Sequence, residues 1–315
     1  YYLQIELDED GDNTYINLGM MELLSVPYAL FAAEAPAQTS VRDTDWDTQI
    51  HVEKTSDDDV IRFDMGGVEY FKMDSGRLHI QYTGESVFIG EGAGANDDLD
   101  LNRNTFVGHE SGNATTWGSG NSAFGHSSLL YNTTGYANTA LGHRTLQDNI
   151  DGDFNVAVGA DAMMENESGY RNVAVGAAAL LASDGSKRNV AVGDLSMANH
   201  MNGERNTAVG YRTLMVDSAG RGNVAIGSKA MHLSEGINYC VAIGDSALYN
   251  NTDNGYGGSW GSANVAIGSK SMHTNTTGYL NTAVGYNTLM ENTTGILNVA
   301  MGGYALSNSV HGLAN

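Results

Sequence analysis

The chain has 315 residues, of which 41% are hydrophobic, and its 37 acidic and 15 basic residues give a formal net charge of −22. The composition is neither that of a disordered chain nor that of a membrane protein, since no run approaches the roughly 18 apolar residues that a bilayer crossing requires. So acidic a surface repels phosphate backbones and anionic lipid head groups, which argues against nucleic-acid binding and against peripheral membrane binding, while the lack of a long apolar run argues against membrane insertion by this segment. Cys240, the single cysteine, cannot form an intrachain disulfide, and no Cys/His spacing suggests zinc.

Residues 1–40 predict a small β-hairpin followed by a connector. The segments 2–7 and 14–18 alternate between apolar and polar residues as strands do, and a turn joins them. Residues 20–35 are compatible with a short helix on either side of Pro27, although the bond before Pro27 favours a break. The chain starts neither with Met nor with the basic residues of a signal peptide, so we expect a mature product or a fragment.

The turn of this hairpin is a candidate calcium site. Asp8, Asp10 and Asp12 place three carboxylates at alternate positions, and calcium prefers such hard oxygen ligands. The bidentate Glu that completes an EF-hand loop is missing, and a solvated acidic turn is the alternative interpretation. Apart from this calcium ion, we expect no cofactor.

Residues 41–83 predict a β-rich collar. Strand-like segments at 50–53, 60–63, 68–71 and 78–80 are separated by Asp and Gly turns. Residues 1–80 contain 17 acidic and 5 basic residues, a net charge of −12, so the acidity is concentrated before the repeats that follow.

Residues 84–315 consist of thirteen repeat units. One glycine, called the repeat glycine below, recurs at intervals of 17 residues with an 18-residue step at the start and one 24-residue step: Gly90, Gly108, Gly125, Gly142, Gly159, Gly176, Gly193, Gly210, Gly227, Gly244, Gly268, Gly285 and Gly302. The residue two before it is Ala in eleven units and Phe in the other two, Phe88 and Phe106, and the residue just before it is always apolar. A small residue follows three positions after it, and Leu or Met follows four positions after it in eleven units. The residue four before it is Asn in eleven units, including Asn138, Asn155, Asn172, Asn189, Asn206 and Asn223.

This period predicts an all-β fold, a parallel β-solenoid or β-roll of about thirteen coils. Seventeen residues are too few for a helix pair, whereas Asn-Val-Ala-Val-Gly joins a β-prone segment to a residue that tolerates positive φ, so two short strands and two glycine turns per coil fit. Stacked coils would bring each Asn over the next at about 4.8 Å, as a side-chain ladder, and would give a rod of roughly 60 Å. The β-rich collar would seal the first coil, whose strand edge is otherwise unpaired.

The expected interior of such a coil is thin. We expect one Ala, one Val or Ile such as Val192, and one Leu or Met to point inward in each unit. A single rod then buries little apolar surface against the conformational entropy of about 1 kcal/mol or more per residue. Other copies must complete the core, and a homotrimer with one strand face turned to the common axis supplies it with closed symmetry.

The 24-residue step marks the largest irregularity in the repeats. Residues 250–262 add seven residues to one coil, and Tyr256 and Trp260 within them are suited to stacking on a sugar ring. Trp117 lies in a shorter segment of similar composition. A neutral insertion without binding activity is the alternative.

Other polar residues recur at repeat spacing without forming a catalytic motif. His109, His126 and His143 occupy equivalent places in three successive coils, where an exposed polar ladder is favoured over a metal site. No nucleophile elbow, HExxH helix or phosphate-binding loop occurs, so we expect no enzyme.

The run Asn189-Val-Ala-Val-Gly193, followed by a small residue and Leu or Met, resembles the head repeat of YadA-like trimeric adhesins. Those heads are left-handed parallel β-rolls assembled as trimers, and their repeat is shorter than 17 residues. A closer similarity is to surface or secreted fibre proteins of Bacteroidetes-type bacteria and to some phage tail fibres, whose repeats read like residues 281–295. Residues 24–32 and 84–94 also resemble segments of these fibres.

The resemblance implies a non-enzymatic, extracellular or cell-surface homotrimeric fibre, either a surface adhesin or a tail fibre, that displays binding activity toward a cell-surface glycan or protein receptor. A structural filament of trimers stacked end to end is the second hypothesis. The third is a polysaccharide-processing solenoid, although the coils of pectin-cleaving solenoids are longer and their acids cluster on one face.

Overall fold

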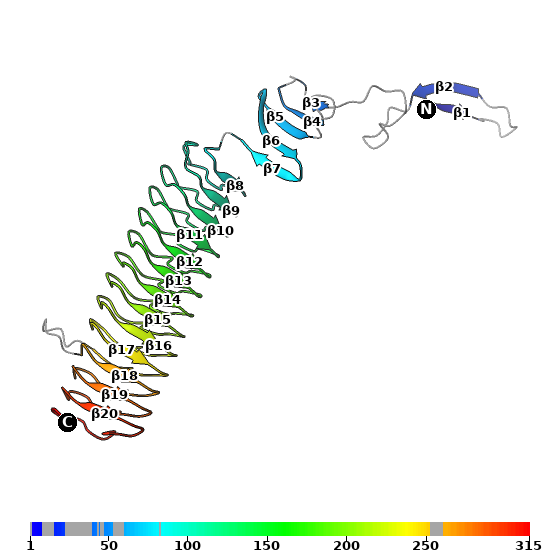
Figure 1. Cartoon of the computed structure of the whole chain (residues 1–315). Coiled ribbons are helices and arrows are strands. Elements are labelled where there is room, and N and C mark those ends of the chain that lie inside the picture. The colour runs from blue at the N-terminus through cyan, green and yellow to red at the C-terminus, as the bar shows by residue number, and fades with distance from the viewer. Residues whose placement is uncertain are drawn as a thin grey trace. The chain divides into compact units, whose positions relative to one another are not determined.

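The structure is a computed structural model that describes residues 2–7, 16–22, 40–42, 44, 47–52, 60–81, 83–252 and 261–315. The chain forms two compact units, Tyr1–Gln81 and Tyr82–Asn315 (Figure 1). All the regular secondary structure of the described residues is β, and none of them forms a helix long and apolar enough to cross a membrane.

The first unit contains two antiparallel sheets. Strands β1 (Tyr2–Leu7) and β2 (Ile16–Glu22) form the expected hairpin, and the second sheet has the order β3-β4-β5-β6-β7. Its strands match the four predicted segments and add one more: β3 (Ser40–Arg42), β4 (Gln49–Val52), β5 (Ile61–Met65), β6 (Val68–Asp74) and β7 (Arg77–Ile80). The expected helix is wrong over residues 20–22, which belong to β2, and the rest of it lies outside the described residues.

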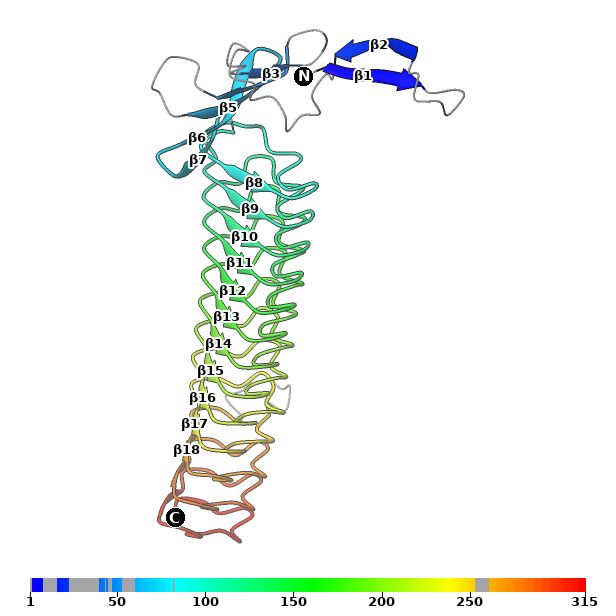
Figure 2. The same ribbon diagram turned by 90° about the vertical axis from the view of Figure 1, so that its right-hand side faces the viewer.

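The second unit is a parallel β-solenoid, as the period predicts. Thirteen three-residue strands, one per repeat, follow one another in sequence order in a single sheet (Figure 2). The strands are β8 (Val87–Ile89), β9 (Thr105–Val107), β10 (Ser122–Phe124), β11 (Thr139–Leu141), β12 (Val156–Val158), β13 (Val173–Val175), β14 (Val190–Val192), β15 (Thr207–Val209), β16 (Val224–Ile226), β17 (Val241–Ile243), β18 (Val265–Ile267), β19 (Thr282–Val284) and β20 (Val299–Met301). Equivalent residues pair in register, so Ala174 lies opposite Ala191 and Val175 opposite Val192.

The repeat glycine is required by close stacking of the backbone. At Gly193, φ is +130°, and a Cβ atom would lie 2.4 Å from the carbonyl oxygen of Gly210 in the next coil. Residues after the glycine also adopt the left-handed conformation, for example Leu195 and Met197 with φ of 55° and 51°. In the described part of the solenoid, these turns leave one short strand per coil rather than the two expected, and the other strand-like pairings are isolated bridges such as Tyr170↔Lys187.

The interior holds the Ala and Leu/Met rows but not the Val/Ile row. Ala191 and Met197 are fully buried, whereas Val192 is only half-buried. Side chains alternate between the two faces of a strand, so once Ala191 points inward, Val190 and Val192 must point outward. The expectation that Val192 points inward is therefore wrong.

The first two coils exchange large and small residues across the core. Where Phe88 and Phe106 replace the inward Ala, Gly94 and Gly112 stand four residues after the repeat glycine in place of Leu or Met. A Cβ atom on Gly112 would lie 2.4 Å from the Phe106 ring, and one on Gly94 would lie 2.5 Å from Phe88. One large side chain therefore fills each of these coils, as in the others, but it comes from the opposite wall.

The asparagines four residues before the repeat glycine form a continuous ladder. The Asn189 backbone N–H donates to Asn172 Oδ1 at 3.0 Å, and its side-chain Nδ2 donates to Asn172 Oδ1 at 3.2 Å and to the Gly203 carbonyl at 2.9 Å. Asn206 repeats the pattern on Asn189. Cys240 replaces one member, and its backbone N–H still donates to Asn223 Oδ1 at 3.0 Å.

A second buried row lies seven residues after the repeat glycine. Asn149 Nδ2 donates to Asn132 Oδ1 at 2.8 Å, and Asn166 Nδ2 donates to Asn149 Oδ1 at 2.9 Å. In the middle of the rod this row changes to other polar residues, all fully buried: Ser183, His200, Asp217 and Ser234.

Candidate functional site

The most extensive candidate surface is the outer side of the solenoid sheet, called the strand face below. It consists of the first and third residues of each strand from β8 to β20, because the central residue points inward. The first residue is Val, Thr or Ser, and the third is apolar in every coil. Nine of these third residues are exposed: Ile89, Phe124, Leu141, Val175, Val209, Ile226, Ile243, Ile267 and Met301.

The strand face is a continuous and mostly apolar stripe. Thirteen strands at about 4.8 Å, two residue steps wide, give a stripe on the order of 400 Å². Apolar patches of this size on a soluble protein mark interaction surfaces more often than scattered exposed residues do. Figure 2 shows the strands of this face aligned one above another along the solenoid.

The residues expected to bind a sugar or calcium are placed only in part. Tyr256, Trp260, Asp8, Asp10 and Asp12 lie outside the described residues. Trp117 is described and is 72% exposed on the segment between β9 and β10, where its backbone N–H donates to the Thr133 carbonyl.

The inserted segment leaves the stacking intact on both sides. Strand β17 pairs directly with β18, with Val241 opposite Val265, although their repeat glycines are 24 residues apart. At the edges of the insertion, Thr252 N–H donates to the Thr276 carbonyl at 2.8 Å and Gly261 N–H donates to the Thr277 carbonyl at 3.2 Å. The additional residues are therefore accommodated without a change of register.

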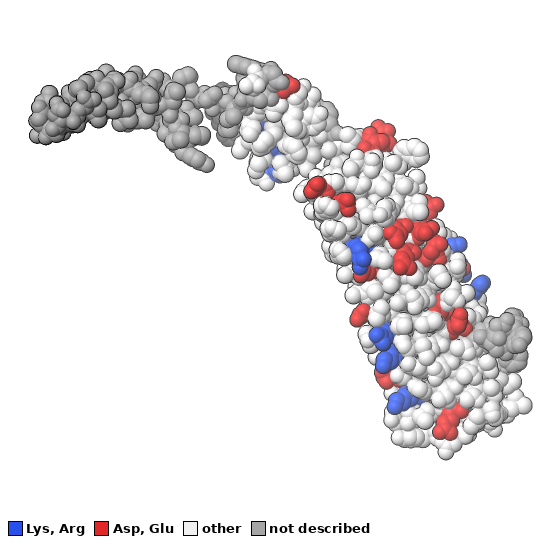
Figure 3. Space-filling view, turned by 180° about the vertical axis from the view of Figure 1, so that it is seen from behind, with Lys and Arg blue, Asp and Glu red and all other residues white. Residues whose placement is uncertain are grey.

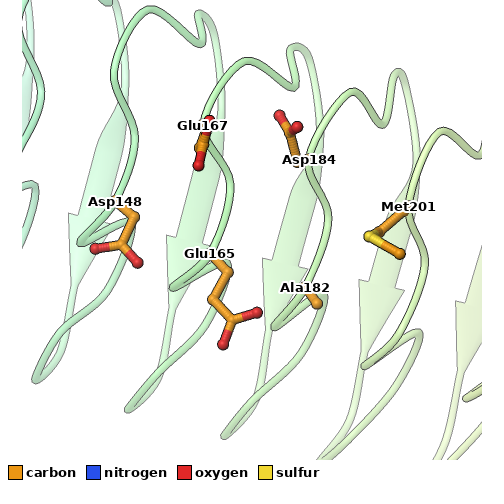
Figure 4. A pocket seen from close by; sticks show the side chains of 6 residues that line it. All are labelled: Asp148, Glu165, Glu167, Ala182, Asp184 and Met201. Atoms are coloured by element: carbon orange, nitrogen blue, oxygen red, sulfur yellow. The ribbon is translucent and has the colours of Figure 1, made fainter.

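An acidic hollow of about 370 Å³ lies on another face of the solenoid. Its lining comes from successive coils, with Asp148 and Glu165 on one side and Glu167 and Asp184 on the other (Figure 4). Partial burial raises the pKa of Asp148, and Asp184 accepts hydrogen bonds from the backbone N–H and the hydroxyl of Ser168. Among the described residues, no group of three or more His, Cys, Asp or Glu is arranged to hold a metal ion.

The three histidines at equivalent places form a stacked surface ladder. The ring centroids of His109 and His126 lie 5.0 Å apart, and those of His126 and His143 lie 5.4 Å apart. Glu110 and Asp161 lie beside the outer two rings at 3.7 and 3.9 Å. This geometry is that of an exposed polar ladder.

The buried polar groups of the interior are not accessible to a substrate. Ser183, His200 and Asp217 combine the residue types of a hydrolase triad in successive coils, but all three are fully buried. Burial lowers the pKa of His200 to about 4 and raises the pKa of Asp217 to about 6. Burial also raises the pKa of the Cys240 thiol to about 12, which makes this cysteine unreactive.

A strand face turned to a trimer axis was predicted, but its Val and Ile residues were assigned to the interior, because all three strand residues are apolar in most repeats and the period of two that separates inward from outward residues is hidden. The size of the residues was the available signal, since the central one is Ala in eleven repeats. Searches of protein-family models, curated proteins and solved structures find no match to this chain.

Proposed function

We propose that this protein is a subunit of a homotrimeric extracellular fibre of the adhesin or tail-fibre type, in which three rods turn their strand faces to a common axis. The observation that carries the proposal is the apolar strand face on thirteen successive strands. Three such faces together present on the order of 1,200 Å² of mostly apolar surface to the common axis. Burying them removes from water the apolar side chains that a single rod leaves exposed.

The fibre role rests on the shape and regularity of the solenoid. A rigid rod spaces a binding activity away from a surface, and the exposed Trp117 and the seven-residue insertion in the sequence are departures from the regular repeat. The extracellular location and the choice of a glycan or protein receptor as partner rest on the resemblance of the repeats.

The test measures the oligomeric state by light scattering. Val192→Asp and Val209→Asp place carboxylates on the strand face, where three copies would meet near the axis, and unpaired buried charges cost several kcal/mol. We expect the parent to be a trimer and the variant to be monomeric. The control Leu233→Asp changes an equally exposed apolar residue, 43% exposed against 37% for Val209, outside the strand face, and should remain trimeric.

Two results would contradict the proposal. A monomeric parent at micromolar concentration would show that the strand face has another occupant. A trimer that survives both strand-face charges would place the interface elsewhere. Rods of increasing length in micrographs would instead support the filament hypothesis.

A further inference from the structure

A row of cationic and aromatic side chains follows one edge of the solenoid, and we call it the basic ridge. Its members lie five or six residues before the repeat glycine in five successive coils: Phe154, Tyr170, Arg171, Lys187, Arg188, Arg205 and Arg221. Parallel backbone bridges join Tyr170 to Lys187, Lys187 to Glu204, and Glu204 to Arg221. The backbone therefore holds these side chains at regular coil spacing, about 19 Å from first coil to last.

The basic ridge is an exception on an acidic protein. It holds five of the 15 Lys and Arg residues of the chain, and Asp153 and Glu204 are the acidic residues at the same positions, so 5 − 2 gives a local charge of +3. Arg171, Arg188, Arg205 and Arg221 are exposed. Figure 3 shows acidic side chains gathered near the middle of the solenoid on the face seen from behind, with Lys and Arg toward its margins.

The cation–π contacts within the ridge position the cations without neutralising their charge. The Arg171 guanidinium lies 5.6 Å from the Phe154 ring, and Lys187 Nζ and the Arg188 guanidinium lie 5.5 and 5.8 Å from the Tyr170 ring. Such cation–π contacts position a charge but leave it free to meet an anion.

One carboxylate serves two of the guanidinium groups. Arg188 Nη1 and Arg205 Nη2 both contact Glu204 Oε1, at 2.9 and 3.2 Å. Among the described residues, no carboxylate lies within ion-pairing distance of Arg171, Lys187 or Arg221, which leaves most of the positive charge available to a partner.

We propose that the basic ridge binds a linear anionic polysaccharide lying along the rod axis. This inference rests on the proposed function, a fibre that displays a binding activity, and names its ligand class. Guanidinium groups pair with carboxylate or sulfate groups in a bidentate manner, and the Phe154 and Tyr170 rings provide apolar surface for the C–H faces of sugar rings. A polymer with regularly spaced charges matches a row that presents one or two cations per coil.

A nucleic acid fits the same row less well. Duplex DNA carries one charge per about 1.7 Å, so the overall charge of −22 and the neighbouring acidic hollow repel it strongly. A polysaccharide with at most about one charge per sugar is repelled less strongly, because its charge density is lower, and it can make the same contacts with the ridge.

The test measures binding of polygalacturonate and of dextran sulfate, with uncharged dextran as the control polymer, at low and physiological salt. The ridge variant carries Arg171→Gln, Lys187→Gln and Arg205→Gln. The matched control carries Arg212→Gln, Lys229→Gln and Lys270→Gln, which removes the same charge from a row two residues after the repeat glycine. We expect the ridge variant to lose at least tenfold in affinity and the matched control to lose less than threefold.

Tyr170→Ala should weaken binding severalfold with no change in its salt dependence. Preference for polygalacturonate identifies carboxylate recognition, and preference for dextran sulfate identifies sulfate recognition. Equal losses of affinity in the two triple variants would show that binding depends on the net charge of the protein and not on the ridge, and would overturn the proposal. Absence of binding by the parent, or ridge-dependent binding that is tighter to single-stranded RNA than to either glycan, would also overturn it. Light scattering on the same samples reports the trimer independently, so failure of the ridge and failure of the assembly are distinguishable.

Discussion

Exchanging the core residues of the second coil tests how the solenoid interior is specified. Phe106 is fully buried, and Phe106→Ala should cost about 3 to 5 kcal/mol, because it removes a large side chain from a packed site. Gly112→Leu alone should also destabilise, by about 3 kcal/mol or more, because its Cβ atom would lie 2.4 Å from the Phe106 ring.

The double variant Phe106→Ala with Gly112→Leu should recover most of this loss. It gives the coil the Ala and Leu pair of Ala123 and Leu129 in the next coil, and Leu129 adopts φ of 55°, close to the 59° of Gly112. The contact with Phe88, whose ring is stacked on Phe106 at 5.6 Å, is lost, which costs about 0.5 to 1.5 kcal/mol. We therefore expect a coupling free energy of about 4 kcal/mol or more between the two sites.

Hydrogen exchange of the amides in residues 105–115 measures the stability of this coil. A local measurement is needed because a rod of stacked repeats need not unfold in one step. Thermal melting provides the global comparison. The reverse exchange, Ala140→Phe with Leu146→Gly, is the matched control and should be tolerated better than either single change. If Gly112→Leu alone leaves the exchange rates unchanged, or if the double variant is as unstable as the sum of the singles, the large side chain is not shared between the two walls.

Three further predictions concern the buried polar rows and the backbone. Asn189→Ala should destabilise the rod by about 3 kcal/mol, since it leaves the buried Asn206 N–H without an acceptor, and faster exchange of that amide is the measurement. Burial raises the pKa of Asp217 to about 6, so this group lowers the free energy of unfolding as pH rises from about 4 to 6. Burial lowers the pKa of His200 to about 4, so this group lowers the free energy of unfolding as pH falls from about 6.5 to 4. The two pH dependences oppose each other in the parent. Asp217→Asn should therefore raise the melting temperature at pH 7.5, and the melting temperature of this variant should fall as pH drops below 6.5, because only the His200 effect remains. A variant whose melting temperature is as insensitive to pH as that of the parent would contradict this. Gly193→Ala should prevent stacking of its coil, because the new Cβ would lie 2.4 Å from a carbonyl oxygen, and unchanged melting would refute that requirement.

The 17-residue period predicted the solenoid because stacking imposes the same conformation on equivalent residues. A glycine with positive φ recurs in all thirteen turns and an asparagine that bridges two coils recurs in eleven of them, so both leave a regular signal in the sequence. The antiparallel strands of the first unit were also predictable from alternation. The helix expected near Pro27 had no comparable signal, since it rested on a single short segment.

The second polar row and the basic ridge were not predicted, for a common reason. Ser183, His200 and Asp217 interrupt the asparagines of the second row, so no single residue type marks the position. On the ridge, Tyr170, Lys187, Glu204 and Arg221 occupy one equivalent position with different chemistry. A search for identical residues at a fixed period passes over positions whose backbone repeats but whose side chains do not.

Positions whose side chains repeat in every coil specify the fold, whereas positions whose side chains vary from coil to coil are free to provide a specific function. Interior positions accept change only when a partner compensates, as Phe106 and Gly112 do, and the proposed trimer would require an apolar strand face. The edges of the coil meet neither requirement, because their side chains point into solvent and their backbone is already held by the rows beside them. In the proposed fibre, selective recognition would therefore arise at such edges, where residues from neighbouring coils combine into a surface that no single repeat contains.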